Sequence, residues 1–71
     1  MITATVYVEL LDEGVRAWRP VEAEPLDGDR YRLIGERPDD EVWPFTTGDV
    51  VRCEMRELNG EIVMVAIQKS E

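Results

Sequence analysis

Histidine is absent from this 71-residue chain, and cysteine occurs only once, as Cys53. Histidine is the commonest general base and the commonest nitrogen ligand of metals, so its absence weighs against both kinds of site. One cysteine forms no disulfide within the chain and no paired-cysteine zinc motif. We therefore expect no zinc site, and a free thiol that suits a reducing compartment.

Long hydrophobic runs are also missing. No apolar stretch approaches the ~20 residues of a membrane-spanning helix. The N-terminal stretch MITATVYVEL has neither a basic start nor an unbroken apolar segment, so it does not resemble a secretory signal peptide. These two absences lead us to expect a cytoplasmic protein.

Basic residues are few. The chain carries 16 Asp and Glu against 8 Lys and Arg, a formal net charge of -8, and Lys69 is the only lysine. Such a field repels nucleic acid phosphates and anionic lipid and attracts a basic partner. With 44% hydrophobic and 34% charged residues, the composition is that of a globular protein. The length leaves room for a single domain over residues 1–71.

What the sequence does contain is alternation. In ITATVYVEL, every second residue is apolar, while Thr3, Thr5, Tyr7 and Glu9 would face the other side of a strand. No segment keeps the helical spacing of apolar residues beyond about two turns without Gly or Pro. The pattern predicts five strands and one long connection over 37–48. The strands are expected near 2–11, 15–24, 30–36, 49–57 and 61–68.

The turn ending in Asn59-Gly60 sets the register of the last two strands. A two-residue loop of Asn59 and Gly60 would place Val65 opposite Glu54. A three-residue loop of Leu58, Asn59 and Gly60 would instead place Val65 opposite Cys53. Because the longer loop makes one face of the hairpin wholly apolar, it is the one that we favour.

The first hairpin is harder to place. A loop of residues 12–14 would put Trp18 opposite Val8, with its ring on the inner face. That register leaves the apolar residues further along the strand out of phase. Pro20 cannot donate to a ladder, so we expect it to mark a bulge or a sheet edge, after which the apolar residues can turn inward.

The turn LDGDR between the second and third strands has one simple solution. A loop of Asp27, Gly28 and Asp29 pairs Ala23 with Leu33. Both of these apolar residues then face the inner side of the sheet.

Five short strands, three tight hairpins and one long loop predict an all-β, antiparallel, closed or nearly closed barrel. The long loop ends in Phe-x-x-Gly-Asp, at residues 45–49, and a strand-turn-strand segment follows. In these features most of the chain resembles an SH3-like small barrel. A five-stranded OB-like barrel is the alternative, although OB barrels usually carry a helix. The chain is also similar to small bacterial proteins with a Trp-Arg-Pro-Val strand, here residues 18–21, which implies a fold and no activity.

The clustered residues Trp43, Pro44 and Phe45 raise the question of a partner site. We expect Phe45 to plug the barrel, whereas Trp43 is divided between burial and a role as an exposed anchor. The predicted function is a non-enzymatic protein-binding module: an adaptor, an accessory subunit, or an inhibitor or immunity-type protein. Apolar anchoring and charge would direct it to a basic partner. The predicted partner-binding residues, on the 37–44 loop and the first strand, are Trp43, Asp39, Asp40, Glu41 and Tyr7.

The sequence offers few residues for a catalytic site or a metal site. Cys53 takes an inward position with no histidine beside it, which predicts an inert core thiol. The acids Glu36, Asp39, Asp40 and Glu41 lack the spacing of a calcium loop, and no glycine-rich phosphate loop is present. We expect no enzyme activity, no metal and no cofactor.

Three alternatives remain beside the protein-binding function. An acidic surface can mimic nucleic acid and occupy a nucleic-acid-binding protein. Self-association is open if the barrel is not closed, since free sheet edges pair. A nucleic-acid-binding barrel would use the strand arginines Arg16, Arg19, Arg30 and Arg32, with Arg52 and Arg56 on the fourth strand.

Overall fold

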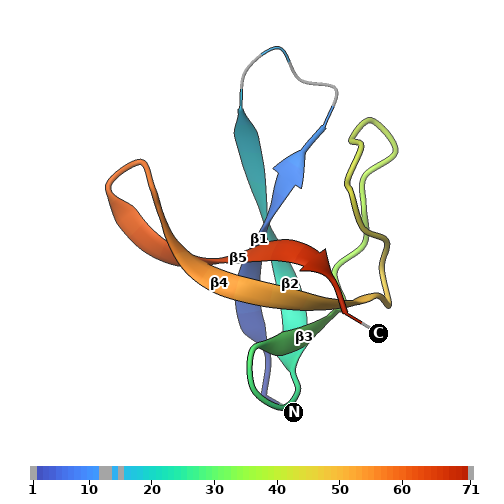
Figure 1. Ribbon diagram of the computed structural model, residues 1–71. Coiled ribbons are helices and arrows are strands. Elements are labelled where there is room, and N and C mark those ends of the chain that lie inside the picture. Colours follow the sequence, from blue (N-terminus) through green and yellow to red (C-terminus); the bar gives the residue numbers. More distant parts are fainter. Residues whose placement is uncertain (1, 12–13, 15, 71) are drawn as a thin grey trace.

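The computed structural model describes residues 2–11, 14 and 16–70, whose five strands close into one barrel (Figure 1). Each strand lies within three residues of its predicted bounds, because alternation marks strands well and their ends less well. The all-β, five-stranded barrel is confirmed. In chain order the strands are β1 (Ala4–Leu10), β2 (Ala17–Pro25), β3 (Arg30–Leu33), β4 (Val50–Leu58) and β5 (Glu61–Lys69).

The barrel is not purely antiparallel, as we had predicted. Strands that follow one another along the chain pair antiparallel, but β1 and β5, which close the barrel, pair parallel at Tyr7 and Val65. The reason is the odd number of strands: when directions alternate, the first and the fifth run the same way. Closure also removes the open barrel on which the expectation of edge-to-edge association rested.

The β1–β2 register differs by one residue from the prediction. Pairing runs along both strands without a shift and places Trp18 opposite Glu9, not opposite Val8. The inward placement of Trp18 is therefore wrong, and so is the bulge at Pro20. A one-residue shift turns every side chain to the other face, which brings the apolar residues of both strands into phase. The predicted loop 12–14 lies largely outside the described residues.

The β4–β5 hairpin has the two-residue turn, so the favoured three-residue loop is wrong. Asn59 and Gly60 both have positive φ, 53° and 84°, as the two central residues of a type I′ turn require. The backbone twist of this turn matches the twist of the strands. This match outweighs the wholly apolar face that the three-residue loop would have given. In the register that this turn sets, Cys53 stands opposite Ala66, and both are buried. The register shifts only beyond this pair, between Arg52 and Cys53.

The β2–β3 turn is as predicted. Ala23 stands opposite Leu33, and both are buried. The Leu26 N–H donates to the Arg30 carbonyl at 2.9 Å, and the Arg30 N–H donates to the Asp27 carbonyl at 3.1 Å. These two bonds close the three-residue loop.

The core fills the barrel and continues into the long connection. The predicted burial of Phe45 is confirmed, and Trp43 is buried with it, at 7% exposure. A chain this small has few large side chains to bury, so these two rings contribute much of its apolar packing. The other members of the core cluster are Val6, Val8, Val21, Ala23, Leu33, Val51, Cys53 and Ala66.

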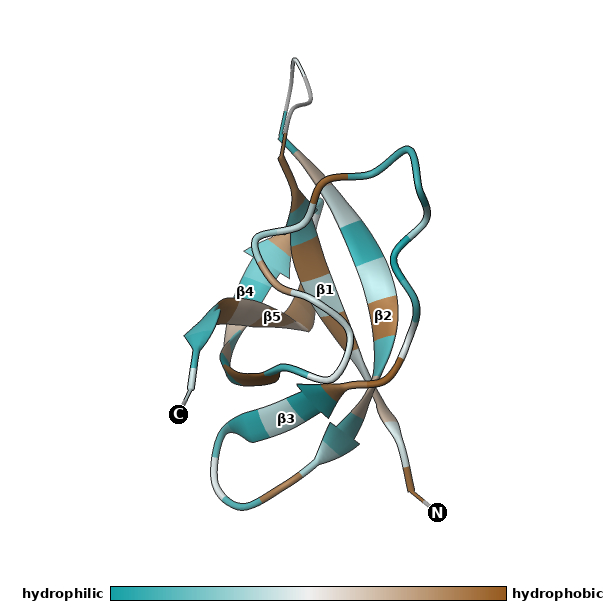
Figure 2. Cartoon of the chain, turned by 90° about the vertical axis from the view of Figure 1, so that its right-hand side faces the viewer, coloured by the Kyte–Doolittle hydropathy of each residue, from teal (hydrophilic) through white to brown (hydrophobic). Residues whose placement is uncertain are grey.

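The connection between β3 and β4 carries these rings across the barrel. It climbs beside β2, passes over β1 and returns to β4 (Figure 2). The Gly35 N–H donates to the Glu22 carbonyl at 3.0 Å, and the Leu11 N–H donates to the Val42 carbonyl at 2.7 Å. Attachment to both strands of the first hairpin holds Trp43 over the core.

Candidate binding cleft

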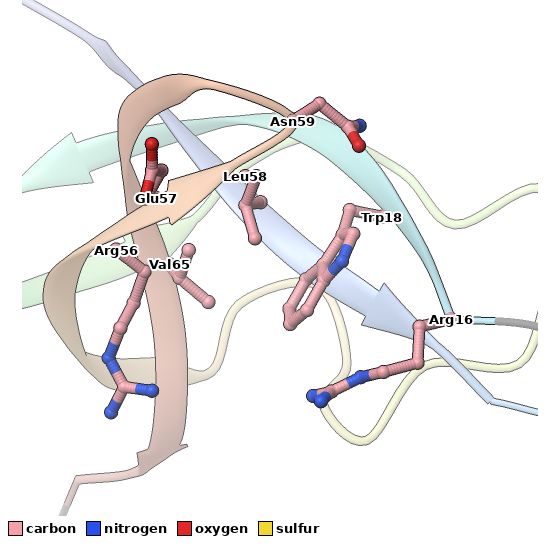
Figure 3. A pocket seen from close by; sticks show the side chains of 7 residues that line it. All are labelled: Arg16, Trp18, Arg56, Glu57, Leu58, Asn59 and Val65. Atoms are coloured by element: carbon pink, nitrogen blue, oxygen red, sulfur yellow. The ribbon is translucent and has the colours of Figure 1, made fainter.

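Two hairpins project from the barrel, and a cleft lies between them. In Figure 1 the β1–β2 hairpin points upward and the β4–β5 hairpin points to the left. Side chains from the start of β2 and from the β4–β5 hairpin enclose a cavity of about 370 Å³, shown in Figure 3. The residues that line it are Arg16, Trp18, Arg56, Glu57, Leu58, Asn59 and Val65.

A second hollow, of about 290 Å³, adjoins the first. The two share part of their lining, so we treat them as one feature and call it the hairpin cleft. Each hollow is near the lower end of the roughly 300–1,000 Å³ that is usual for ligand sites, so side chains fit it better than large ligands do. The second hollow is lined by Tyr7, Arg16, Ala17, Trp18, Leu58, Asn59, Glu61 and Val63.

Trp18 lies in the middle of the cleft because of its register. On the outer face of the first hairpin, its ring projects between the hairpins beside Leu58 (Figure 3). Val65 is only 3% exposed although it is not part of the core cluster, so side chains around the cleft bury it. The cleft thus has a small apolar floor of its own outside the barrel.

Charged side chains surround this floor. The guanidinium carbon of Arg16 lies 5.4 Å from the centre of the Trp18 ring, and Arg16 Nε donates to Glu9 at 3.3 Å. Arg56 Nη2 donates to Glu54 at 2.6 Å. The Arg16 side chain is 76% exposed, and exposed ion pairs of this kind are weak. Both arginines can therefore change partners at little cost.

The predicted partner surface on the 37–44 loop is built differently. The Trp43 ring is in the core, and its indole nitrogen donates to the Glu41 carboxylate at 3.0 Å. Arg19 Nε donates to the same carboxylate at 3.1 Å, and the Glu41 side chain is only 10% exposed. These bonds, that from Arg19 above all, hold the pKa of Glu41 below its usual value. The arrangement fastens the loop.

The other predicted partner-binding residues are divided between two places. Asp39 and Asp40 are exposed on the loop, whereas Tyr7 lines the hairpin cleft with Trp18. Binding at the loop stays a prediction. The sequence reasoning missed the cleft, and the signal that could have found it is the Asn-Gly turn. The shorter loop that this turn favours brings Val65 to the face where Trp18 lies.

Every arginine of the chain is engaged within the chain. Arg37 donates to the Pro38 carbonyl at 3.2 Å, and the six others form ion pairs. A phosphate would have to compete with these carboxylates, which weakens the electrostatic case for nucleic acid. The ion pairs are Arg16–Glu9, Arg19–Glu41, Arg30–Asp27, Arg32–Glu24, Arg52–Asp29 and Arg56–Glu54.

Cys53 lies in the core, as predicted. Its burial, with a smaller contribution from the charge of Asp29, raises the pKa of the thiol to about 11. A thiol with this pKa is protonated at neutral pH and is a poor nucleophile. Within 2–11, 14 and 16–70, no three His, Cys, Asp or Glu gather as metal ligands.

The same ranges contain no helix that is long and apolar enough to cross a membrane.

The opposite face of the β4–β5 hairpin is apolar as well. Met55 stands opposite Met64, and Ile62 lies next along the same face, at 70% exposure. Met64 packs against the core cluster, whereas Met55 is 55% exposed. Met55 and Ile62 are therefore exposed apolar side chains outside the hairpin cleft.

No protein-family model, no curated protein and no solved structure matches this chain. The similarity to small bacterial proteins that we drew from residues 18–21 therefore gains no support. Function has to be argued from the geometry of the chain alone.

Proposed function

We propose that this protein is a non-enzymatic protein-binding module and that the hairpin cleft, not the 37–44 loop, is its binding surface. The observation that carries the proposal is the half-buried ring of Trp18, which projects into an open cleft with an apolar floor. Tryptophan and arginine dominate the energetics of protein interfaces. Burying the rest of this ring would supply binding energy that a monomer leaves unused.

The partner that we propose is an extended segment of another protein. Two adjoining hollows can receive neighbouring side chains of such a segment, while Trp18 and Leu58 pack against it. The loosely held pairs of Arg16 and Arg56 can rearrange as it enters. An adaptor, an accessory subunit or a small inhibitor would all bind in this way.

We also propose the SH3-like barrel, rather than the OB-like one, as the fold. Five strands that pair in chain order, and no helix within the described residues, support this choice. The fold by itself assigns no ligand, because one fold hosts many functions.

The experiment is a pull-down from a nuclease-treated lysate of the organism that encodes the chain. Three baits are compared: the wild type, Trp18→Ala, and the double variant Asp39→Asn, Asp40→Asn. Circular dichroism first establishes that all three are folded. Capture of a protein counts only if it depends on Trp18.

The proposal predicts a partner that the wild type and the loop variant retain and Trp18→Ala loses. Loss of more than about tenfold in recovery is expected for a central aromatic anchor. A partner that Trp18→Ala retains and the loop variant loses would return the binding surface to the 37–44 loop. If no captured protein depends on Trp18, the proposal is wrong.

A further inference from the structure

We infer that the hairpin cleft takes a cationic side chain, arginine or lysine, from a basic segment of the partner. The side chain would lie against the Trp18 ring, at the place that Arg16 occupies in the free protein. Arg16 is then an internal competitor for the site. This inference rests on the proposed function and names the chemistry of its ligand.

The first observation is the position of Arg16. Its guanidinium carbon is 5.4 Å from the centre of the Trp18 ring, within the roughly 6 Å over which a cation is attracted by an aromatic face. The ring face is thus already a site for a cation. Because the Arg16 side chain is mostly exposed, it gains little packing there, and an incoming cation can replace it.

The second observation is the charge around the cleft. Glu9 stands opposite Trp18, Glu54 opposite Val65, and Glu61 at the turn, so these three carboxylates belong to the faces that border the cleft. Glu57 also lines the first hollow, so the two guanidinium groups of Arg16 and Arg56 leave two negative charges in excess. Glu61 lines the second hollow and forms no ion pair among the described residues.

The third observation is the field of the whole chain. A formal charge of -8 attracts a basic segment and repels an acidic one. An anionic ligand would have to bind against this field and to displace Glu9 or Glu54 from its arginine. A cation that replaces Arg16 meets a carboxylate, Glu9, that the exchange leaves free. The balance therefore favours a cationic ligand.

The probe is the peptide acetyl-Arg-Gly-Arg-amide, titrated into ¹⁵N-labelled protein at about 0.15 M salt. The control peptide carries citrulline, which has nearly the shape of arginine and no charge, at both positions. A third peptide, acetyl-Glu-Gly-Glu-amide, tests the opposite charge. The indole N–H signals of Trp18 and Trp43 report on the cleft and on the buried ring in the same spectrum.

We expect the arginine peptide to shift the Trp18 signal with saturation and to leave the Trp43 signal in place. The citrulline peptide should bind at least about threefold more weakly, since it keeps the shape and loses the charge. Binding of the glutamate peptide in its place, or equal binding of arginine and citrulline, would overturn the inference.

The sharper test is the sign of the effect of Arg16→Ala. If Arg16 competes with the ligand, its removal tightens binding of the arginine peptide by about twofold to fivefold. Arg32→Ala is the matched control: it changes the net charge equally, and Arg32 lines neither hollow. At about 0.15 M salt, charges more than ~8 Å away are largely screened, so Arg32→Ala should change affinity little.

Weaker binding after Arg16→Ala would show that Arg16 contacts the ligand directly, and the inference would be wrong. If Arg16→Ala and Arg32→Ala change the affinity equally, the effect comes from the net charge of the chain and not from competition by Arg16, and the inference would also be wrong. These outcomes are separate from the proposed function. If a captured partner depends on Trp18 but the arginine peptide does not bind, the hairpin cleft remains the binding surface and the inference of a cationic ligand is wrong.

Discussion

The two tryptophans of this chain have the same two companions, an arginine and a glutamate, in opposite arrangements. Trp43 is buried, and its indole shares the Glu41 carboxylate with Arg19. Trp18 is half-buried, and Arg16 lies on its ring and turns to Glu9. In the first arrangement the charges fasten a loop over the core, and in the second they border an open cleft. Burial, not residue type, separates the stabilising group from the candidate binding group.

The largest expected difference between the two is in stability. Trp43→Ala should cost about 3–5 kcal/mol of unfolding free energy, as is usual for truncation of a buried tryptophan. Trp18→Ala should cost about 1 kcal/mol, because much of its ring is exposed already. Urea unfolding followed by circular dichroism measures both. Equal losses would show that the two rings do not differ in the way described.

The second prediction concerns the hairpin that carries the cleft. Gly60 has φ of 84°, so Gly60→Ala should cost about 1–2 kcal/mol and disturb the turn beside Trp18. Urea unfolding gives the cost, and the Trp18 indole signal should shift more than that of Trp43. Gly14→Ala is the control, since no atom lies within 4 Å of the added methyl group. If Gly60→Ala changes neither the free energy of unfolding nor the Trp18 signal, the tight two-residue turn is wrong.

The third prediction is that the free energy of unfolding depends on pH through Glu41, the carboxylate that binds Trp43 and Arg19. The pKa of Glu41 is lowered in the folded protein, so its charge stabilises the fold above the ordinary value of 4.5, and this contribution is lost as the pH falls through the lowered pKa. Glu41→Gln should therefore flatten the acid limb of stability. Urea midpoints between about pH 5 and pH 3 measure it.

Arg19→Ala provides the matched test, because the bond from Arg19 is the main cause of the shift. It should also flatten the acid limb. If neither variant changes the slope, Glu41 does not hold the loop as described.

Much of the fold could be predicted from local patterns. Alternation located five strands, and the Asp27-Gly28-Asp29 loop gave the pairing of Ala23 with Leu33. Both other hairpins were placed one residue out of register. In the β4–β5 hairpin, the preference for a wholly apolar face outweighed the Asn-Gly turn. In the β1–β2 hairpin, the loop over 12–14 was assumed although it put the apolar residues out of phase, and the observed register brings them into phase.

The cleft could not be predicted, because it depends on two hairpins that are distant in the sequence. Whether Trp18 faces inward depends on the β1–β2 register, and its neighbours Leu58 and Val65 depend on the β4–β5 register. The burial of Trp43 depends on the path of the 37–48 connection, which no alternation specifies. Of these relations, only the β4–β5 register has a local signal, the Asn59-Gly60 turn.

The most direct test of the account is hydrogen exchange of the two indole N–H groups in the wild-type protein. Two-dimensional NMR resolves the two signals, and Trp18→Phe assigns them. We predict slow exchange at Trp43, whose N–H donates to Glu41, and much faster exchange at Trp18, which opens to the cleft. Equal exchange, or a protected Trp18 beside an exposed Trp43, would contradict the assignment of one ring to the core and the other to a binding surface.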